Sequence, residues 1–587
     1  MPNTRVMLWA ALAAILFLNY EAWVKDYPAS TPGSASAPAP FGAAPSSLGD
    51  SVPLANAPPQ NPGAAAANAP ASPTPAATAV VPAAPLGAAA PAPADAAAAA
   101  DIGTAATAES VHVITDVLDL VISTKGGELD RADLLQYPLH KDTPNIPVRL
   151  FDDTPGDSLY VLQSGLAGAA GEAAPTHLAL WTAAEKSYAL GDSAQELHVP
   201  LSWSDGHGLK VTKTFAFKRG SYAIGLNYLV QNDSESARSL AAYTQILRHW
   251  VKPSRSYFDV ETYSFKGPSI YDGTKTEDLK VDSDTDSKFS QSITNGWIAS
   301  LQHHFVSAVV PQAGKTQTVQ LKVQDSQYLL SATGPMVAIA PGASTEFHEK
   351  LFVGPKLQTQ LEATGPELAR TVDYGRLYIL AHPLFAVLTW VHGVVANWGW
   401  SIIIVTALIK LLFYPLSQAS GRSMAKMRAI SPRMKQIQES YKDDREKLGR
   451  AMMELYKREK INPLAGCLPM VVQIPFFISF YWVLLESVEM RQAPFLLWIN
   501  DLSSRDPFFV LPLLMGGAMF AQFKLNPAPP DPMQAKIMQF MPLVMTGMMA
   551  WFPSGLVLYW LTNTVLSIVQ QWRVNQVVQS EAGKQRP

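Results

Sequence analysis

The sequence predicts a multi-span α-helical membrane protein, with six transmembrane helices and a large exported domain built as an antiparallel β-sandwich. Three observations predict this fold class. Hydrophobic residues make up 48% of the 587 residues and charged residues only 16%, whereas soluble globular chains carry about 25% charged residues. Long runs without charge fill the C-terminal part, and apolar and polar residues alternate with a period of two in the middle of the chain. A purely soluble protein does not fit this composition.

Charge, cysteine content and motifs narrow the function classes. The formal net charge is −3, so the chain has no overall basic surface for DNA. Cys467 is the only cysteine, which permits neither an intramolecular disulfide nor a multi-cysteine metal site. The nucleotide, zinc-protease, serine-hydrolase and dinucleotide motifs GxxxxGK, HExxH, GxSxG and GxGxxG do not occur. The sequence therefore predicts a protein that is not an enzyme, with no catalytic residues, no cofactor and no metal.

Residues 1–25 are predicted to form an N-terminal signal-anchor transmembrane helix. The apolar stretch 6–24 is about one bilayer long, follows Arg5 and has no clear cleavage site after it. Asn19 and Glu21 weaken its outer end, which leaves a cleaved secretory signal as the alternative. As an anchor, the helix places the N-terminus in the cytoplasm.

Residues 26–110 are predicted to be a disordered Ala/Pro-rich linker. No Lys or Arg occurs between residues 26 and 124, and most of the linker is Ala and Pro. Such a composition cannot bury enough apolar surface to offset the entropy of the chain. Because prolines favour extended conformations, the linker is expected to act as a semi-stiff tether.

Residues 111–372 are predicted to form the exported β domain. Apolar residues alternate with other residues in several runs, such as Tyr222, Ile224, Leu226, Tyr228 and Val230. This pattern is typical of strands that bury one face. Turn sequences at 218–221 and 311–314 separate such runs. One-sided alternation over this length indicates a large antiparallel sandwich.

Residues 397–572 are predicted to form a core of five transmembrane helices, because the chain beyond residue 375 is dominated by charge-free runs at 377–409, 461–485, 507–523 and 537–572. The last run contains the turn sequence Trp-Phe-Pro-Ser-Gly at 551–555, so it is expected to form two helices.

A basic loop sets the predicted topology. Residues 416–460, expected to be a helical hairpin, hold twelve Lys or Arg against six Asp or Glu, so they belong in the cytoplasm. With the β domain outside, only one crossing fits between the two. Residues 373–396 are therefore predicted to be an interfacial amphipathic helix on the outer surface. Residues 573–587 then form a cytoplasmic C-terminal tail.

Lys410 is the strongest candidate for a functional residue, because a charge inside a membrane costs roughly 2.5–3.5 kcal/mol. Thr406, Lys410 and Tyr414 are spaced i, i+4 and i+8, so they are expected to share one helix face. Further candidates for the same site are Gln473, Tyr559, Trp560, Asn563 and Ser567. Two alternatives stay open: Lys410 snorkels to the inner headgroups, and the neutral side chains only form hydrogen bonds between helices.

The cytoplasmic hairpin is the second candidate site. Apolar residues at helical spacing mark a face on each of its two helices, and the candidate contact residues are Met424, Met427, Arg428, Met434 and Met452. Methionine-rich faces adapt to varied apolar partners, although a seam between the two helices explains the same pattern. The positive charge of the hairpin would suit anionic lipids or ribosomal RNA.

Five long stretches carry a resemblance to a known family: NWGWSIIIVTALIKLLFYPL at 397–416, SMAKMRAISPRMKQI at 423–437, INPLAGCLPMVVQIPFF at 461–477, SVEMRQAPFLLWINDLSSRDPFF at 487–509 and WFPSGLVLYW at 551–560. They resemble the YidC membrane protein insertases, which are related to the oxidase-assembly insertases of mitochondria and the thylakoid. A signal anchor with a large exported domain is expected of the Gram-negative branch, where this domain resembles the β-super-sandwich of sugar mutarotases. One departure is Lys410, because bacterial members usually carry Arg there. The charge is kept, but the bidentate guanidinium is lost.

This resemblance implies an insertase and chaperone of the bacterial inner membrane. It would insert, fold and assemble integral membrane proteins, alone or with the Sec translocon, through a positively charged hydrophilic groove open to cytoplasm and lipid. The implied partners are nascent membrane proteins, the Sec translocon, the ribosome and anionic lipids, and no DNA. The alternative is a secondary transporter that binds a small anion at Lys410, but the sequence shows no inverted repeats that would favour it.

Overall fold

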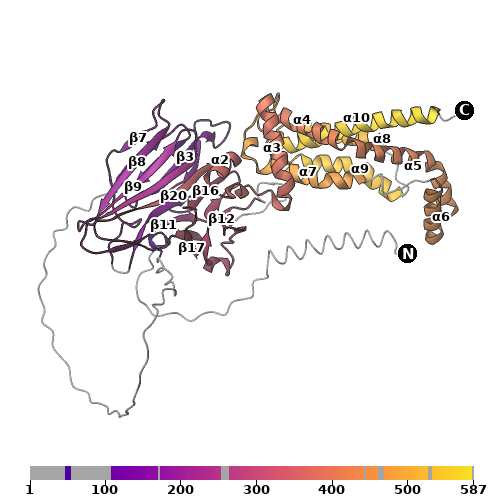
Figure 1. The fold of residues 1–587 in the computed structure, drawn as a ribbon. Helices are drawn as coiled ribbons and strands as arrows, with labels where there is room; N and C mark the ends of the chain where they lie inside the picture. The colour runs from indigo at the N-terminus through magenta and orange to yellow at the C-terminus, as the bar shows by residue number, and fades with distance from the viewer. Residues whose placement is uncertain are drawn as a thin grey trace, which may run out of the picture. The chain divides into compact units, whose positions relative to one another are not determined.

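The computed structural model describes residues 47–53, 108–169, 172–252, 264–441, 444–459, 468–525 and 532–584. The predicted signal anchor at 1–25 and most of the predicted linker lie outside these residues. The described residues from Leu48 onward belong to one compact unit. Within that unit a β-rich domain is followed by a helical region (Figure 1).

Two sheets build the β domain. The first has eleven strands: β1 (Ser110–Ile114), β2 (Leu118–Ser123), β3 (Glu128–Pro138), β4 (Pro147–Phe151), β5 (Tyr160–Gly168), β7 (Ser187–Ala189), β11 (Arg238–His249), β14 (Ser290–Thr294), β17 (Thr316–Gln324), β18 (Gln327–Thr333) and β19 (Val337–Ile339). The second has nine: β6 (Thr182–Ala183), β8 (Glu196–Ser204), β9 (Leu209–Lys218), β10 (Ala223–Asn232), β12 (Gly267–Tyr271), β13 (Thr276–Asp278), β15 (Trp297–Leu301), β16 (Phe305–Pro311) and β20 (Ser344–Pro355).

The strand pairs are almost all antiparallel, as the alternating pattern predicts. In the described residues every strand pair is antiparallel except β1 with β7, which is parallel. On β10, which lies between β9 and β20, the alternate residues Ile224, Leu226, Tyr228 and Val230 are buried. The buried faces of both sheets contribute to one hydrophobic core, so the predicted antiparallel sandwich is confirmed.

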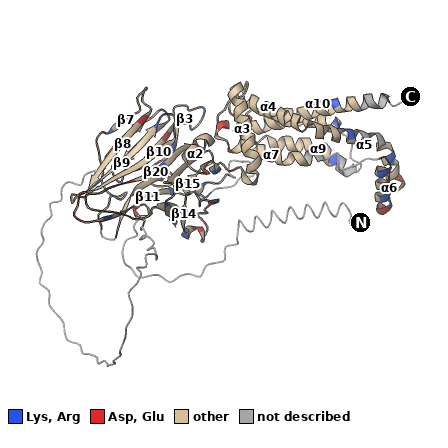
Figure 2. Ribbon diagram, viewed as in Figure 1, with Lys and Arg blue, Asp and Glu red and all other residues tan. Residues whose placement is uncertain are grey.

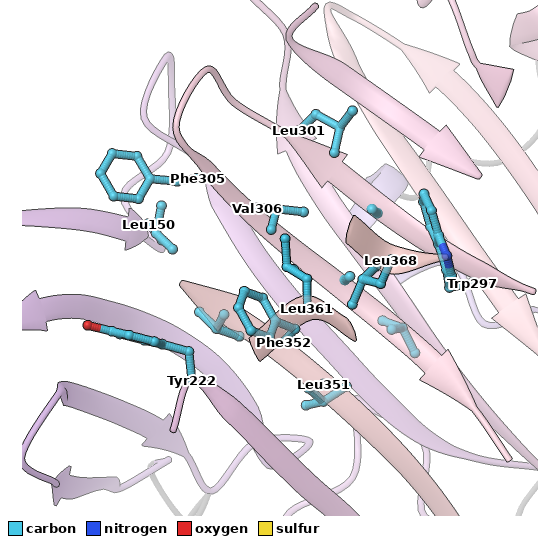
Figure 3. Close-up of a cluster of buried hydrophobic side chains, with 14 of the residues drawn as sticks. Leu150, Tyr222, Trp297, Leu301, Phe305, Val306, Leu351, Phe352, Leu361 and Leu368 are labelled. Atoms are coloured by element: carbon cyan, nitrogen blue, oxygen red, sulfur yellow. The ribbon is translucent and has the colours of Figure 1, made fainter. Parts of the chain in front are cut away.

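Short helices extend this core at the end of the β domain. Leu361 of α2 (Gln358–Thr364) and Leu368 of η4 (Leu368–Thr371) are fully buried and belong to the same cluster as Trp297 of β15. Figure 3 shows these side chains beside Val306, Leu351 and Phe352. The indole Nε1 of Trp297 donates a hydrogen bond to the Pro366 carbonyl at 3.1 Å, which joins the segment between α2 and η4 to the sheet.

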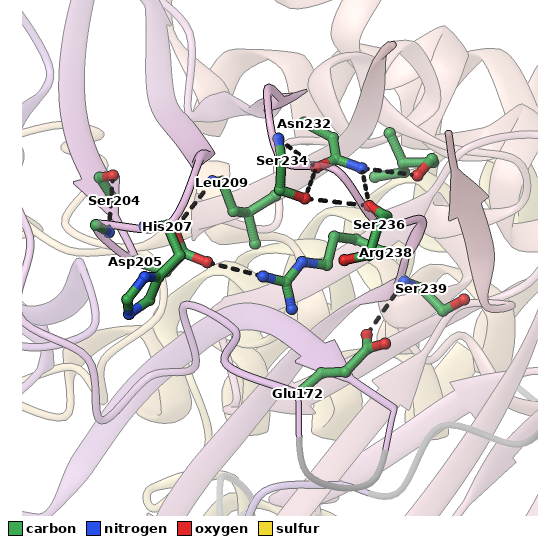
Figure 4. Close-up of polar contacts among 12 residues, drawn as sticks. Glu172, Ser204, Asp205, His207, Leu209, Asn232, Ser234, Ser236, Arg238 and Ser239 are labelled. Atoms are coloured by element: carbon green, nitrogen blue, oxygen red, sulfur yellow. Dashed lines mark hydrogen bonds and ion pairs between the residues drawn. The ribbon is translucent and has the colours of Figure 1, made fainter. Parts of the chain in front are cut away.

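Polar contacts fix the turns at one end of the sandwich (Figure 4). Asp205, in the β8–β9 turn, accepts a hydrogen bond from Arg238 at the start of β11 at 3.2 Å. The amide of Asn232 donates to the carbonyls of Ser236 and Ile339, both at 2.9 Å. These bonds tie the β10–β11 connection to β19 and to the neighbouring turn.

The helical region begins where the sequence predicts the interfacial segment. Its helices are η5 (Gly375–Leu377), α3 (Tyr378–Val395), α4 (Trp398–Leu412), α5 (Tyr414–Ser440), α6 (Arg445–Arg458), α7 (Leu468–Glu486), η7 (Val488–Met490), α8 (Val510–Leu525), α9 (Pro532–Met549) and α10 (Ser554–Lys584). Ala396 adopts a left-handed conformation with φ 53° and ends α3. Asn397 then caps α4, because its side chain accepts a hydrogen bond from the Trp400 backbone N–H.

Few of the described helices are both long and apolar enough to cross a membrane. Among the described helices, α3 is the only one that is long and apolar enough by itself to cross a membrane. Helix α4 and the first part of α5 (Tyr414–Ser423) meet the criterion together, but they are bent by 61°. The segments Val471–Glu486 and Val510–Leu525 are apolar but shorter. The described residues thus contain one or two clear spans, and the prediction of six is not confirmed.

Helix α3 runs across the direction of α4, α7 and α10 (Figure 1). It packs against α4 and α7 with Ala381, Phe385, Leu388 and Val391. The crossing direction is the one expected of a helix that lies along a membrane surface, whereas its length and apolar character also suit a span. Its interfacial placement therefore stays a prediction.

Part of the predicted linker differs from the expectation of disorder. Leu48–Asp50 form a 3-10 helix, η1, and Leu48 is buried against the β domain. This segment was not predicted from composition, because a single leucine flanked by Ser and Gly does not change the average hydrophobicity of a long Ala/Pro-rich stretch.

Candidate functional site

Lys410 lies where three helices converge. Its Nζ donates a hydrogen bond to Ser567 Oγ on α10 at 2.9 Å and lies 3.5 Å from Gln473 Oε1 on α7. All three side chains are partly buried. The structure therefore brings together three of the residues that the sequence proposed as one site. A lysine that only snorkels to a headgroup would not need partners on two other helices.

The predicted polar face of α4 is interrupted. The Thr406 hydroxyl donates to the Ile402 carbonyl of its own helix at 2.6 Å, and the side chain is buried. Helix α4 ends at Leu412, and Tyr414 begins α5 after the 61° bend. Pro415 explains the break, because proline has no N–H for the helical hydrogen bond and clashes with the preceding turn. The i, i+8 spacing of Thr406 and Tyr414 therefore does not place them on one continuous helix face.

The remaining candidates on α10 divide into two groups. Tyr559 is buried and packs against Phe477 and Phe480 of α7, with ring centroids 5.5 and 4.8 Å apart. Trp560 also packs against Phe477, at 4.7 Å. Two turns further along, the Ser567 hydroxyl donates to the Asn563 carbonyl at 2.7 Å and also accepts from Lys410. The aromatic pair thus holds α10 against α7, and Ser567 carries the polar contact.

The outer faces of the helices are apolar. Leu412, Leu513 and Leu543 are 69%, 64% and 71% exposed, and further large apolar side chains on α3 and α7–α10 are exposed with them. Soluble proteins rarely expose apolar surface on this scale. Figure 2 shows few charged residues on α3, α4, α7 and α8, whereas Lys and Arg gather on α5 and α6. This distribution is that of a membrane-embedded bundle with a basic extension.

The methionines of the hairpin lie mainly in its seam. Met434 is buried together with Ile430 of α5 and Leu455 of α6, and Met427 and Met452 pack against this cluster. Arg433 of α5 pairs with Glu459, just beyond α6, at 2.6 Å. The side chains of Met424 and Arg428 lie outside the described part of the structure. The structure thus places Met427, Met434 and Met452 in the seam of the hairpin, and their role as contact residues for a substrate stays a prediction.

Two carboxylates that the sequence pattern did not single out organise the loop between α7 and α8. Asp506 is buried and accepts hydrogen bonds from Trp498 Nε1 at 3.0 Å and from the Leu511 backbone N–H at 2.7 Å. Asp501 accepts from the backbone N–H groups of Gln492 and Ser503 at 3.0 and 2.8 Å. The available signal was the pair of aspartates in the run 501–506, with three polar residues between them. Such runs favour side chain to backbone hydrogen bonds.

Family comparisons cover both parts of the molecule. Residues 110–387 match the family described as YidC periplasmic domain, and residues 390–581 match the family described as 60Kd inner membrane protein. A membrane protein insertase YidC of Thioalkalivibrio sulfidiphilus is 44% identical over 598 residues, and the match covers 100% of both chains. A relative of the same name from Pseudomonas putida is 46% identical and covers 81% of this chain and 85% of its own.

A solved structure is also similar. A crystal structure of an active YidC insertase, with its first transmembrane domain resolved, aligns with 78% of this chain and 92% of that chain at 16% identity, with a TM-score of 0.34. The sequence matches extend over the β-rich domain and the helical region alike. The chain therefore belongs to the YidC family of membrane protein insertases, proteins of the inner membrane with a large periplasmic domain.

Proposed function

We propose that this protein inserts nascent membrane proteins through a hydrated groove in which Lys410 supplies the positive charge. The observation that carries the proposal is the contact of Lys410 Nζ with Ser567 Oγ at 2.9 Å, with Gln473 Oε1 3.5 Å away. Hydroxyl and amide partners lower the cost of keeping a charge among apolar helices. Among the described residues no carboxylate forms an ion pair with Lys410, so its charge is available to an acidic substrate in this proposal.

The proposed mechanism needs no nucleotide. A short hydrophilic segment of the substrate enters the groove from the cytoplasm and leaves bulk water at a reduced desolvation cost. Lys410 attracts its acidic side chains, while the following hydrophobic segment partitions into lipid. The hydrophobic effect and the membrane potential supply the driving force.

The basic hairpin α5–α6 receives the substrate in this proposal. Its Lys and Arg side chains suit the anionic leaflet and ribosomal RNA, and Figure 2 shows them gathered on these two helices. We infer that the protein works alone or with the Sec translocon, that the hairpin and both termini are cytoplasmic, and that no cofactor or metal takes part.

Crosslinking of stalled nascent chains tests the groove directly. A photoreactive residue placed at Ser567 or Gln473 is expected to crosslink to the hydrophilic segment of a ribosome-bound substrate. The matched control is the same residue at Leu513, which is exposed on the outer apolar face of α8. Leu513 is expected to capture lipid or the hydrophobic segment instead. Equal capture of the hydrophilic segment at both positions would contradict the groove.

Removal of the β domain is expected to leave insertion largely intact, because Lys410 and the helices around it all follow residue 377. A chain lacking residues 115–340 should still insert a small two-span substrate in cells depleted of the native protein. Protease accessibility of the translocated tail measures the result. Complete loss of insertion at normal levels of the shortened protein would refute this expectation.

The position of α3 is tested by labelling single cysteines in a Cys467→Ser background. Gly393 lies near the end of α3 and Gly449 lies in α6, and a side chain at either position would meet only open space. An interfacial α3 predicts that Arg376→Cys and Gly393→Cys both react with an impermeant thiol reagent added outside, whereas Gly449→Cys reacts only after permeabilisation. Reaction of Arg376→Cys but not Gly393→Cys in intact cells would show that α3 crosses the membrane.

A further inference from the structure

A short piece of the linker occupies a specific place on the β domain. The segment 48–53 precedes the first strand of the domain by more than fifty residues of linker. Leu48 is 7% exposed and packs in a small cluster with Val161 of β5, Leu247 of β11 and Leu329 of β18. This cluster is separate from the main core of the sandwich. The leucine therefore fills an apolar depression formed by three adjacent strands of the eleven-stranded sheet.

Side chains of the sheet and of one loop also form hydrogen bonds with the backbone of this segment. The Gly49 carbonyl accepts hydrogen bonds from His177 Nε2 at 2.9 Å and from Gln163 Nε2 at 3.2 Å. The Ser51 carbonyl accepts from Gln245 Nε2 at 3.3 Å, and Gln245 also donates to Gln163 Oε1 at 2.7 Å. His177, Gln163 and Gln245 are each at least nine-tenths buried. In the docked state these three side chains are enclosed between the sheet, the loop and the segment rather than exposed to solvent.

The protonation of His177 suits this role. The Tyr243 hydroxyl lies 2.7 Å from His177 Nδ1 and accepts from the His177 backbone N–H at 3.0 Å, so its own proton is free to point at Nδ1. Nε2 then carries the hydrogen that the Gly49 carbonyl accepts. Burial lowers the pKa of His177, which keeps the ring in this neutral, donating form.

Two glycines allow the His177 loop to lie on the sheet. A Cβ on Gly126, which has φ +72°, would lie 2.2 Å from the His177 carbonyl oxygen. A Cβ on Gly165 of β5 would lie 3.0 Å from the His177 backbone nitrogen. This close approach holds the His177 loop against the sheet and so helps to position the imidazole that donates to the Gly49 carbonyl.

We propose that this face of the eleven-stranded sheet is a peptide-binding site, and that its ligand is the chain's own linker segment 48–53. The site takes a leucine in the apolar depression and two backbone carbonyls on the buried amide and imidazole donors. Backbone recognition with one side-chain pocket is a common way to bind a short peptide.

Disulfide formation in the full-length chain tests the docking in cis. In a Cys467→Ser background, the pair Leu48→Cys with Leu329→Cys is expected to oxidise rapidly. Leu86, which is also followed by glycine in the linker, supplies a matched control paired with Leu329→Cys. The control pair is expected to form its disulfide at least tenfold more slowly. Equal rates for the two pairs would overturn the proposal, because they would mean that the linker samples the sheet without preference.

Binding in trans tests whether the site recognises a peptide. A fluorescent peptide of residues 45–54 is added to full-length protein that carries Leu48→Asp, a change expected to release the docked segment. Binding should be at least tenfold tighter to this variant than to the wild-type chain, in which the linker competes at high effective concentration. A peptide carrying the same Leu48→Asp change should not bind. Absence of binding to the variant, or equal binding to variant and wild type, would overturn the proposal. A single cooperative thermal unfolding transition in the Leu48→Asp protein checks that the variant is folded, and a modest decrease in its temperature is expected because the docked segment no longer stabilises the domain.

Discussion

Replacement of Lys410 by alanine is expected to impair insertion most for substrates whose translocated segment carries Asp or Glu. An attraction between opposite charges in a partly hydrated cavity is worth on the order of 1 to 4 kcal/mol at effective dielectrics between those of water and protein surface. Even an energy at the lower end of this range changes an equilibrium constant several-fold. Lys410→Arg should retain activity because the charge and the approximate length persist, and Lys410→Glu should be worse than alanine because it repels the acidic segment.

The contacts of Lys410 supply the controls for this series. Ser567→Ala removes the hydroxyl 2.9 Å from Nζ but leaves the charge in place, so it should reduce insertion much less than Lys410→Ala. Lys524, near the end of α8, is exposed and lies over the ring of Phe520. Lys524→Ala removes one positive charge from the same region of the chain and should have little effect.

The measurement is protease accessibility of the translocated tail, for paired substrates with acidic and neutralised tails, at matched levels of the insertase. A lysine that only anchors a helix end predicts a small loss in Lys410→Ala without any dependence on the charge of the substrate. Equal activity of the Ala and Lys forms on the acidic tail would reject the charged-groove mechanism while leaving the family membership intact.

Trp297→Ala is expected to destabilise the β domain by about 3–5 kcal/mol, the usual cost of deleting a large buried aromatic side chain. The side chain is fully buried, and its ring stacks on Tyr271 with centroids 6.0 Å apart. It also donates the hydrogen bond that attaches the segment at Pro366 to the sheet. Trp297→Phe is the matched control, because it keeps most of the apolar contact and loses the Nε1 donor, so a smaller loss of about 1–2 kcal/mol is expected.

Calorimetric unfolding of the full-length protein in detergent measures both variants. The transition of the β domain should move to lower temperature in the order wild type, Phe, Ala. Insertion of the small two-span substrate should persist in Trp297→Ala at matched protein levels, because the proposed groove lies wholly in the helical region. An unchanged transition in Trp297→Ala would contradict the assigned core. Loss of insertion in proportion to the loss of stability would instead link the two parts of the chain.

The sandwich was predictable from local pattern. The alternation at Tyr222–Val230 reports directly which side of a strand is buried, since side chains of a strand point to opposite faces in turn. The pairing order was not predictable, because β11 pairs with β5, β18 and β19, which are far from it in the sequence. The sequence of a single strand does not indicate which strands lie beside it. The helical region was predictable in its apolar runs and in the break at Ala396 and Asn397, but its helix ends were not.

For the candidate site, the sequence by itself determined that Lys410 is an unusual residue, because a charge in an apolar run is costly wherever the fold places it. Tertiary structure decided its partners: Ser567 and Gln473 come from α10 and α7, while the bend at Pro415 moved Tyr414 onto another helix. The methionine pattern fixed a helical apolar face, yet only packing showed that this face is the seam of the hairpin. The docking of Leu48 was likewise not predictable, because the depression that holds it is formed by three strands that are far away in the sequence. The periodicity of a sequence indicates which residues are buried. Which residues they pack against depends on contacts between segments that are far apart in the chain.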